Sequence, residues 1–367
     1  MRVGIITYDF YPPIGGQGVY VYEIYRRLLD RDLMEIYVFS NRKNDLKNSF
    51  YASCPAIFGL GPILFSVYIN LRIKEWVRQN ELDVVHIQGG PGGVFLLINP
   101  GVPVVYTAHH TYAQQYRYFG RRFYKLLMKL EKHGYVMAKK IIAVSSTTKS
   151  SLTDDYDVPS EKITLLPNGV DFHIFRPLSR VKKVPYSILY VGRLDKRKGL
   201  YYLIKAMKHI TKELPTARLY IIGSGHLRNN LEQLIKNERV NNNVVFLGNV
   251  PLDDLVKWYN KAEVFVLPSL FEGFGIVVLE AIACGTPVVG TNVPGIVDII
   301  EHEKTGVLVS PKSELGLKEQ LVYLLSSPKI RRKLTHKSRK RLERKFEWKV
   351  IVERLTELYH DVAYGKL

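Results

Sequence analysis

Residues 264–283 read VFVLPSLFEGFGIVVLEAIA and combine three structural features in one stretch. The apolar run over Val264–Ser269 predicts a buried strand, and the run over Gly275–Cys284 predicts a helix. Between them, Gly273 and Gly275 allow a tight turn and a close approach of the backbone to a ligand. A strand, a glycine turn and a helix in this order are typical of a parallel α/β sheet.

Two carboxylates flank this turn. Glu272 lies in the loop, and Glu280 follows eight residues later inside the expected helix. The amides of Ile276 and Val277 open that helix and would point at an anion, because a helix N-terminus carries partial positive charge. Phosphate at the helix mouth, with carboxylates that accept hydroxyl protons on either side, fits a sugar nucleotide. The alternative is a loop with an acidic cap and a surface glutamate.

A second group of charged residues lies in VGRLDKRKG, residues 191–199, also at the end of a predicted strand. Arg193 offers a planar fork to phosphate oxygens, and Lys198 offers a point charge. These two cations, beside a helix start at Gly199, would neutralise a diphosphate leaving group. The alternative is a solvated basic loop.

The rest of the chain repeats strand and helix units in two halves, which indicates two parallel sheets covered on both faces. Expected strands of the first half are Val3–Tyr8, Glu35–Ser40, Asp83–Gln88, Val102–His109 and Lys140–Ser145, with helices at Val19–Leu29, Ile63–Arg78 and Tyr118–Met137. Expected strands of the second half are Ser187–Leu194, Arg218–Gly223, Val244–Gly248, Val264–Ser269 and Pro287–Thr291, with helices at Leu200–Lys212, His226–Lys236, Leu252–Asn260 and Gly275–Cys284.

The two halves join near Phe172–Pro185, where two prolines interrupt the periodicity. We expect a first domain over residues 1–175, completed by a C-terminal helix within 347–367 that packs back on it. Residues 176–346 would form the second domain. Ligands of such sheets bind beyond the carboxyl ends of the strands, so two facing sheets would place a cleft between the domains.

Composition narrows the class of protein. The chain has 367 residues, of which 46% are hydrophobic and 24% charged, as in globular proteins. No apolar run reaches the roughly 20 residues of a membrane span. The first residues enter a strand pattern directly, so we expect no secretory signal. Cys54 and Cys284 lie far apart in sequence, which argues against a disulfide framework, and we expect a cytoplasmic protein.

The net charge of +19 favours anionic partners such as nucleic acid, acidic lipid headgroups or phosphorylated substrates. The alternative is a cationic, solvated surface. A nucleic-acid-binding protein is the competing class, but the sequence has no helix-turn-helix, zinc-ligand spacing or aromatic RNA-binding signature. We therefore expect no nucleic-acid partner.

Together these motifs resemble family 4 of the retaining glycosyltransferases, whose members share the two-domain GT-B fold. EGFGIVVLE at residues 272–280 matches the family's Glu-x7-Glu motif. VGRLDKRKG is similar to another of its landmarks, and markers follow the family's order along almost the whole chain. The further markers are YPPIGG at 11–16, LLPNGVD at 165–171, VVFLGNV at 244–250 and FEWKVIVERLTELY at 346–359.

The resemblance implies a role for each matching position. Glu272 would face the hydroxyls of the donor sugar, and Glu280 would bind the ribose. His109, with His110 as its rival, matches a histidine near the donor sugar. The implied catalytic residues are His109, Arg193, Lys198 and Glu272. The implied donor-binding residues are Gly15, Gly16, Arg193, Lys198, Phe246, Leu247, Glu272, Gly273, Phe274, Gly275, Ile276, Val277 and Glu280.

The resemblance also implies a reaction. A hexose or N-acetylhexosamine would pass from a UDP- or GDP-sugar to an acceptor by front-side displacement with retention. Donors arranged in advance would stabilise charge on the departing diphosphate. Strand-end cations would replace a metal ion, so we expect no metal and no cofactor beyond the donor itself. An epimerase or a phosphorylase of the same fold is the alternative.

Basic residues beside apolar ones in Tyr118–Lys140 favour a helix that lies on an anionic membrane surface. Packing of its apolar face on its own sheet is the compatible alternative. AHHTYAQQYRYF, residues 108–119, resembles membrane-associated members of the family, which points to a lipid or lipid-linked saccharide acceptor and a peripheral location on the membrane. We expect the second basic run, Lys329–Lys349, to be a solvated face.

Overall fold

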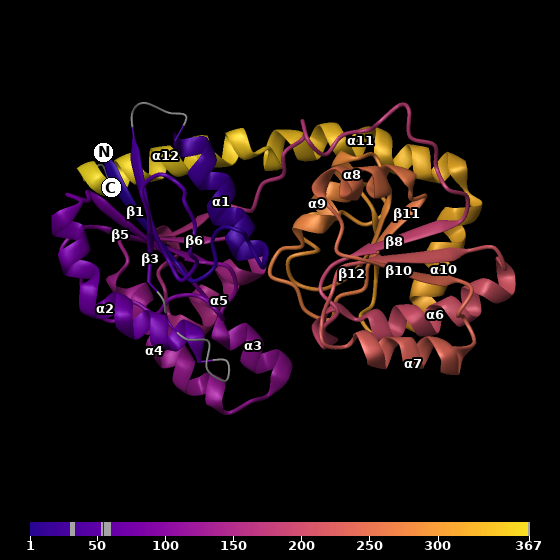
Figure 1. Cartoon of the computed structure of the whole chain (residues 1–367), viewed down its shortest axis with the longest axis horizontal. Helices are drawn as coiled ribbons and strands as arrows, with labels where there is room; N and C mark the ends of the chain where they lie inside the picture. The colour runs from indigo at the N-terminus through magenta and orange to yellow at the C-terminus, as the bar shows by residue number, and fades with distance from the viewer. Residues whose placement is uncertain (30–33, 53, 55–59, 366–367) are drawn as a thin grey trace. The chain divides into compact units, whose positions relative to one another are not determined.

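The chain divides into two compact units (Figure 1). The computed structural model describes residues 1–29, 34–52, 54 and 60–365, without the side chains of His336 and Lys337. Unit 1 comprises Met1–Gly169 and Trp348–Leu367, and unit 2 comprises Val170–Glu347.

The sequence assigns residues 170–175 and 347 to the first domain, but they lie in unit 2. Hydrogen bonds explain their position. The amide of Val170 donates to the carbonyl of Phe346 (2.8 Å), and the amide of Phe172 donates to the Glu347 carboxylate (3.1 Å). The segment that enters unit 2 is thus tied to the segment that leaves it.

Unit 1 contains a parallel sheet of seven strands in the order β3-β2-β1-β4-β5-β6-β7. Its strands are β1 (Arg2–Thr7), β2 (Glu35–Ser40), β3 (Ser49–Tyr51), β4 (Val84–Gly89), β5 (Val104–Ala108), β6 (Lys140–Ala143) and β7 (Ile163–Leu165). Its helices are α1 (Gly16–Leu29), α2 (Gly61–Gln79), α3 (Tyr112–Phe119), α4 (Phe123–Met137), α5 (Ser146–Tyr156) and α12 (Trp348–Tyr364).

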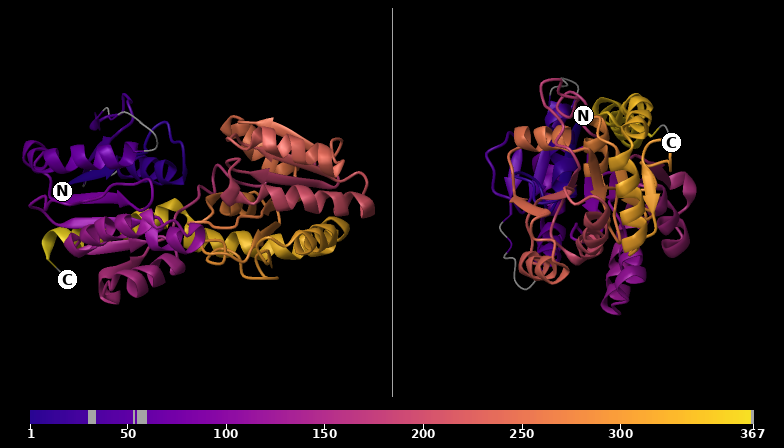
Figure 2. Two further views of the ribbon diagram at one scale, coloured as in Figure 1. Left: turned by 90° about the horizontal axis from the view of Figure 1, so that it is seen from below. Right: turned by 90° about the vertical axis from the view of Figure 1, so that its right-hand side faces the viewer.

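The two faces of this sheet bury separate apolar cores, because successive strand residues point to opposite sides. Val84 packs with α1 and α12, whereas Val85 packs with α2, α4 and α5. Helices accordingly cover both faces of the sheet (Figure 2). Helix α12 contributes Ile351 and Leu355 to the first core, so the end of the chain completes unit 1 as expected.

Unit 2 contains a parallel sheet of six strands in the order β10-β9-β8-β11-β12-β13. Its strands are β8 (Ser187–Val191), β9 (Arg218–Ile222), β10 (Val244–Gly248), β11 (Val264–Leu267), β12 (Val288–Thr291) and β13 (Val307–Val309). Its helices are α6 (Leu200–Glu213), α7 (Arg228–Glu238), α8 (Leu252–Lys261), α9 (Ile276–Ala283), α10 (Glu314–Ser326) and α11 (Pro328–Phe346). Helices α8, α9 and α11 cover one face, and α6, α7 and α10 cover the other (Figure 1).

The strand order of both sheets reverses at one place, between β1 and β4 in unit 1 and between β8 and β11 in unit 2. Loops leave a sheet of this kind in opposite directions at such a switch point, and the crevice that results beyond the strand ends is where ligands bind. The fold therefore predicts ligand binding at the loops that follow β1, β4, β8 and β11.

One predicted helix is wrong. The run over Tyr118–Met137 is divided between α3 and α4, because Gly120 adopts a left-handed conformation (φ 67°) that ends α3. The amide of Gly120 donates to the carbonyl of Tyr116 (2.8 Å), so the helix ends in a regular cap. Among the described residues, no helix is long and apolar enough to span a membrane.

Glu131, a fully buried carboxyl on α4, ties α3, α4 and α5 together. It accepts hydrogen bonds from the amide of Tyr112 (3.0 Å) and from the hydroxyl of Tyr156. Burial raises the pKa of Glu131 to about 7, although these hydrogen bonds act in the opposite direction. The folded protein thus holds this proton more tightly than the unfolded chain does.

We predict that the wild-type protein loses stability as pH rises from about 4.5 to about 7, because a carboxyl with a raised pKa stabilises the fold in its protonated form. The loss is at most about 3 kcal/mol. Glu131→Gln removes the ionisation, so its unfolding free energy should change less over this range. Urea denaturation at pH 5 and pH 8 measures the difference, with Asp154→Asn on α5 as the control. Equal pH dependence in wild type and Glu131→Gln would show that the fold does not raise the pKa of Glu131.

Candidate functional site

The loops that follow β8 and β11 touch at the switch point of unit 2. The amide of Leu270 donates to the carbonyl of Arg197 (2.7 Å). Gly199 has φ +70°, and a Cβ atom at this position would lie 1.9 Å from the carbonyl oxygen of Pro268. Only glycine fits such an approach in a left-handed conformation. These contacts bring the two predicted charged groups together.

A buried ion pair joins the two loops. The Nζ atom of Lys198 lies 2.5 Å from Oε2 of Glu272, and Nη1 of Arg197 lies 3.8 Å from Oε1 of the same carboxylate. Lys198 and Glu272 are each 8% exposed. Two residues that the sequence predicted as site residues, 74 positions apart, are thus direct partners.

The electrostatics of this pair favour the ionised carboxylate. Burial by itself would raise the pKa of Glu272, but the charges of Lys198 and Arg197 outweigh burial and lower the pKa to about 2. Glu272 therefore carries a full negative charge at neutral pH. An ionised carboxylate accepts hydrogen bonds and does not donate them, which suits a partner that presents hydroxyl groups.

Arg193 differs from Lys198 because its side chain is 59% exposed. Its guanidinium lies 3.5 Å from the carboxylate of Asp195. Asp195 also caps the short 3₁₀ turn that carries Lys198, since its side chain accepts from the amide of Lys198 (3.2 Å). Arg193 is therefore far more accessible to an incoming anion than Lys198 is.

Helix α9 begins beside the ion pair. Gly275 precedes it with φ +93°, and the first intrahelical bond runs from the amide of Val278 to the carbonyl of Gly275 (2.9 Å). The amides of Ile276 and Val277 come before that bond and have no acceptor on the preceding turn. The half-buried Gly273 and the buried Phe274 shape the turn itself. The start of α9 thus offers two backbone amides to an anion, and their role as an anion site stays a prediction.

Glu280 lies one turn further along α9 and is half-buried. The hydroxyl of Tyr259, on α8, donates to its Oε2 atom (2.6 Å). Sequence reasoning missed Tyr259, because an aromatic residue in an amphipathic helix reads as an ordinary core residue. The structure shows that it fixes the carboxylate that we expect to meet the ribose.

Phe246 and Leu247, the expected neighbours of the base, lie half-buried on the edge strand β10. The guanidinium of Arg228 stacks over the ring of Phe246, with Cζ 3.7 Å from the ring centroid. Such a stack is a planar, cationic surface of the kind on which a base can lie. Arg228 begins α7 and has no motif around it, so the sequence did not reveal it.

In unit 1, Gly15 ends the loop after β1 and Gly16 begins α1, at the switch point of that sheet. The carboxylate of Asp9 accepts hydrogen bonds from the amides of Ile14 (3.1 Å) and Gly15 (2.9 Å). The amide of Gly15 is therefore engaged with a carboxylate in this conformation, and a phosphate could reach it only by displacing Asp9. The sequence did not identify Asp9.

His109 follows β5 at the same edge of the sheet and is buried. Its Nε2 atom lies 2.9 Å from Oε1 of Gln88, and its ring meets that of Tyr20 edge to face at 5.0 Å. Burial lowers the pKa of His109 to about 3, so its ring is neutral at neutral pH. His110 is half-buried and bonds the side chain of Gln115 instead (3.1 Å), so the two histidines have different environments.

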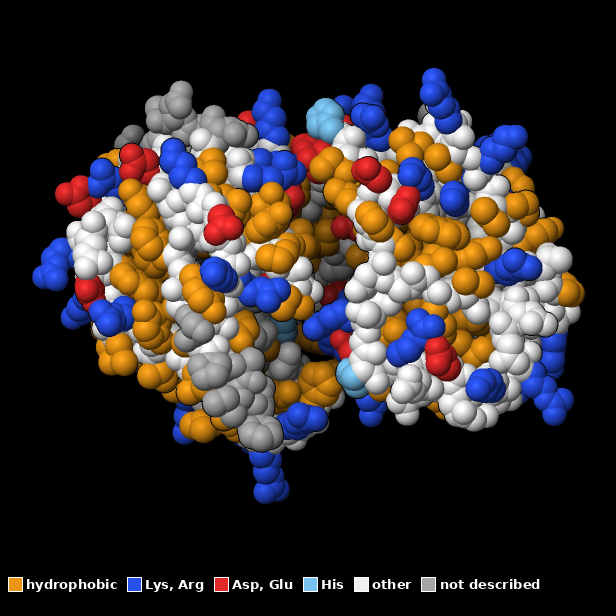
Figure 3. Space-filling model, in the orientation of Figure 1, with side chains coloured by type: hydrophobic (Ala, Val, Ile, Leu, Met, Phe, Trp, Pro, Cys, Tyr) orange, Lys and Arg blue, Asp and Glu red, His pale blue; other side chains and the backbone are white. Residues whose placement is uncertain are grey.

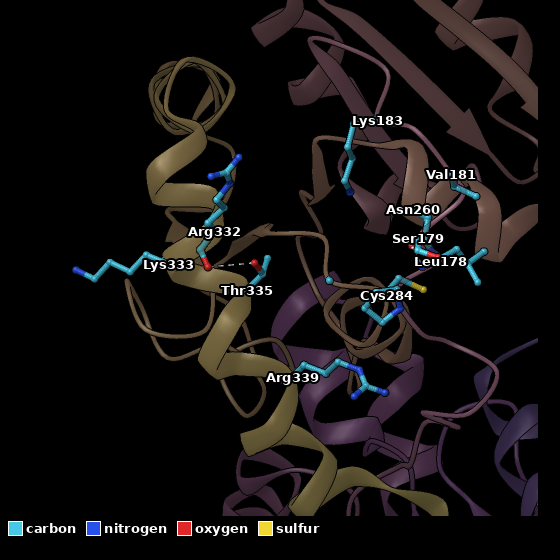
Figure 4. A pocket seen from close by; sticks show the side chains of 12 residues that line it. Leu178, Ser179, Val181, Lys183, Asn260, Cys284, Arg332, Lys333, Thr335 and Arg339 are labelled. Carbon is cyan, nitrogen blue, oxygen red and sulfur yellow. Dashed lines mark hydrogen bonds between the residues drawn. The ribbon is translucent and has the colours of Figure 1, made fainter.

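A cavity of about 860 Å³ lies elsewhere on unit 2, between α11, residues 177–183 and the end of α9 (Figure 4). Two of the cations that line it have helix-end carbonyls as partners. The ammonium of Lys183 donates to the carbonyl of Ala262 (2.7 Å), and Nε of Arg339 donates to the carbonyl of Ala283 (3.0 Å). Lys183 and Gly285 precede β8 and β12, so this cavity lies at the amino ends of the strands, away from the predicted donor residues.

Two family descriptions match consecutive parts of the chain. Residues 14–173 match Glycosyltransferase Family 4, and residues 172–341 match Glycosyl transferases group 1. The chain belongs to glycosyltransferase family 4.

Curated relatives of this family 4 chain include glycosyltransferases from archaea and bacteria. An uncharacterised glycosyltransferase of Methanocaldococcus jannaschii is 37% identical over 60% of this chain and 59% of its own length. A capsular polysaccharide biosynthesis glycosyltransferase of Staphylococcus aureus is 32% identical over 65% of each. N-acetyl-alpha-D-glucosaminyl L-malate synthase of Bacillus anthracis is 25% identical over 99% of this chain and 97% of its own. The chain thus spans under two thirds of the first two relatives and nearly all of the third.

Solved structures confirm the GT-B fold of the family 4 chain. Sucrose-phosphate synthase from Thermosynechococcus elongatus superposes with a TM-score of 0.85, with 22% identity and complete coverage of both chains. WaaG, a glycosyltransferase involved in lipopolysaccharide biosynthesis, superposes with a TM-score of 0.79 and 20% identity over 99% of this chain and 100% of its own. At these identities the likeness concerns the fold.

Gly199→Ala should destabilise unit 2 more than Gly248→Ala does. Both glycines have nearly the same φ (+70° and +69°), but a Cβ at Gly248 has no atom within 4 Å, whereas a Cβ at Gly199 meets Pro268. We expect Gly248→Ala to cost about 1 kcal/mol for the left-handed conformation alone and Gly199→Ala about twice that or more. Urea denaturation measures both. Equal losses would mean that contact between the two loops is not needed for the fold.

Proposed function

We propose that this protein is a retaining glycosyltransferase that transfers a hexose or N-acetylhexosamine from a UDP- or GDP-sugar to an acceptor hydroxyl. The observation that carries the proposal is the cluster at the switch point of unit 2. There an exposed Arg193, the Lys198–Glu272 pair and the first amides of α9 lie on two loops in mutual contact. Cations and amides suit a diphosphate, and the carboxylate suits sugar hydroxyls.

In the proposed reaction, the bond between the anomeric carbon and the diphosphate oxygen breaks. The acceptor oxygen bonds to the same face of that carbon, and its proton passes to the departing diphosphate. The protein's part is to stabilise charge on the leaving group with donors already in place. Lys198 would exchange its bond with Glu272 for one to phosphate, which would release Glu272 to accept from the sugar.

We further propose that the reaction needs no metal, because Arg193, Lys198 and the amides of α9 supply positive charge where the diphosphate would lie. The proposal includes both hexoses and N-acetylhexosamines as donor sugars. The name of one relative, N-acetyl-alpha-D-glucosaminyl L-malate synthase, supports an N-acetylhexosamine, and the name of the capsular polysaccharide biosynthesis glycosyltransferase gives no sugar.

The donor site predicts selective stabilisation by one nucleotide family. We expect UDP or GDP and its sugar conjugates to raise the melting temperature without added metal, because a ligand of the folded state stabilises by mass action. Glu280→Ala and Tyr259→Phe should reduce this shift, and Lys208→Ala on α6 serves as the control. Failure of every nucleotide to raise the melting temperature would contradict the donor site, and steeply salt-dependent binding of DNA or RNA would then favour the competing class.

Arg193→Ala and Lys198→Ala should lower turnover by more than they raise the Michaelis constant, since a leaving-group contact strengthens in the transition state. We expect losses of about 100-fold, as for other preorganised donors to a developing negative charge. Product NMR of the new anomeric centre tests retention in the same assay. Wild-type turnover in both variants would overturn the assigned role, and activity that depends on inorganic phosphate would favour a phosphorylase.

We also propose a lipid or lipid-linked acceptor, presented at an anionic membrane surface. The support is the surface of α3 and α4, where large apolar side chains are exposed. Phe119, Phe123 and Leu126 are 38%, 54% and 57% exposed. Hydrophobic side chains also gather over the visible face of unit 1 (Figure 3). Exposed aromatic and aliphatic groups on a strongly cationic protein suit the boundary between headgroups and acyl chains.

A small cavity of about 280 Å³ lies among α3, α4 and α5. Lys125, Lys129 and Lys132 line it together with Asp155, which pairs with Arg117. Lys132 pairs with Asp157 (2.7 Å), whereas Lys125 and Lys129 have no carboxylate partner in the described chain. The charge of the cavity is complementary to a lipid phosphate.

The double substitution of Phe123→Ser with Leu126→Ser should weaken binding to phosphatidylglycerol-containing vesicles about tenfold. Lys125→Gln with Lys129→Gln should do the same and reduce the salt dependence. Leu315→Ser, which removes a 61% exposed leucine on α10, is the control and should bind as wild type does. Sedimentation with vesicles gives the partition coefficient. Equal binding by all variants, or equal binding to neutral vesicles, would contradict the membrane surface.

A further inference from the structure

A chain of buried polar side chains leads from helix α12 through the sheet of unit 1 to His109. Its members are Tyr359 on α12, His86 and Gln88 on β4, and Thr107 on β5, and none of these four is measurably exposed. Polar groups at this depth are normally fully hydrogen-bonded, so the pattern of their bonds is informative.

Each link of the chain is a hydrogen bond of ordinary length. Nδ1 of His86 lies 2.6 Å from the hydroxyl of Tyr359, and its Nε2 lies 2.7 Å from the hydroxyl of Thr107. Nε2 of Gln88 lies 3.1 Å from Nε2 of His86, and Oε1 of Gln88 lies 2.9 Å from Nε2 of His109. The Gln88 amide is therefore the only link between the two imidazoles in this chain of bonds.

The bonds couple the protonation of the two rings. An amide donates through its nitrogen and accepts through its oxygen. With the amide oxygen on His109, the Nε2 atom of His109 carries the proton and donates to Gln88. With the amide nitrogen on His86, the Nε2 atom of His86 accepts from Gln88 and from the nearer hydroxyl of Thr107, and the proton of His86 lies on Nδ1, toward Tyr359. If the Gln88 amide were turned by half a turn, donor and acceptor would be exchanged in its bonds to His86 and His109. The tautomer of His109 therefore reports the orientation of the Gln88 amide.

Both imidazole rings are neutral at neutral pH. Each ring therefore carries one proton, on either Nδ1 or Nε2. Burial lowers the pKa of both His86 and His109 to about 3. A neutral imidazole with a proton on Nε2 has a bare acceptor at Nδ1. Nδ1 of His109 makes no hydrogen bond within the described chain, so it is the ring atom left for a ligand. Tyr20, edge to face with the ring at 5.0 Å, restrains its rotation.

We propose that Gln88, supported by His86 and Tyr359, is a positioning residue that fixes His109 as a neutral hydrogen-bond acceptor. This inference rests on the proposed function, because it assigns the ligand group that His109 meets. An acceptor at Nδ1 binds a hydroxyl or amide proton of the donor sugar, and it cannot bond a phosphate oxygen or protonate a leaving group. Helix α12 thus has a part in the site through Tyr359.

The test is the tautomer of His109 in the whole protein without ligand. Long-range proton–nitrogen correlation spectra of the ¹⁵N-histidine-labelled protein show which ring nitrogen carries the proton, and His109→Gln assigns the signals. We expect His109 to be neutral with its proton on Nε2, and His86 to carry its proton on Nδ1. A proton on Nδ1 of His109, or a cationic ring at neutral pH, would overturn the proposal.

Gln88→Met tests the link itself. It should allow both tautomers of His109, and it should lower kcat about tenfold with little change in KM, as expected for loss of one buried hydrogen bond to an active group. Gln114→Met, at another buried glutamine of unit 1, is the matched control for folding and should leave the His109 signals unchanged. Unchanged His109 signals in Gln88→Met would remove Gln88 from the mechanism.

The same preparations separate this proposal from the proposed function. Transfer from a nucleotide sugar by a protein whose His109 carries its proton on Nδ1 would leave the transferase standing and overturn the role of Gln88. The expected tautomer in a protein that neither binds nor turns over any nucleotide sugar would confirm the chain of bonds and overturn the transferase.

Discussion

The buried pair of Lys198 and Glu272 is the interaction on which the proposed donor site depends. Removing two charges from water costs several kcal/mol for each ion, and only close contact with further hydrogen bonds compensates for that cost. The loops after β8 and β11 meet this demand, because Gly199 lets their backbones touch and Asp195 caps the turn of Lys198. An anion that binds at the proposed site would meet a lysine that is already largely removed from water.

Much of the fold was predictable because strands buried on both faces appear as apolar runs. The five expected strands of each half correspond to β1, β2, β4, β5 and β6, and to β8 through β12. The strands β3, β7 and β13 have three residues each, too few for a periodic pattern. Gly120 was inside an uninterrupted amphipathic pattern, and only its left-handed backbone shows that it divides α3 from α4.

The residues of the candidate site also fall into a group that the sequence could predict and a group that it could not. Glu272, Glu280, Arg193, Lys198 and His109 stand in local motifs, so the sequence named them, although their roles stay proposals. Tyr259, Arg228 and Gln88 contact partners on other elements, whereas Asp9 accepts from amides of its own loop but stands in no recognised motif. Gln88 reaches His109 because β4 and β5 run side by side in a register that pairs Gln88 with Thr107. Contacts between residues on different strands or helices depend on the folded structure. They cannot be predicted from the spacing of residues along one sequence.

Helix α12 has a consequence for the order in which the protein can fold during synthesis. Residues 348–364 leave the ribosome after all of unit 2, yet Ile351, Leu355 and Tyr359 belong to the core of unit 1. Domains generally fold as units while they are made, the N-terminal one first. Here the first unit must wait with an open apolar face until the second is complete. The nascent chain therefore exposes that face while residues 170–347 are synthesised, which is a stage at which a ribosome-associated chaperone could bind it.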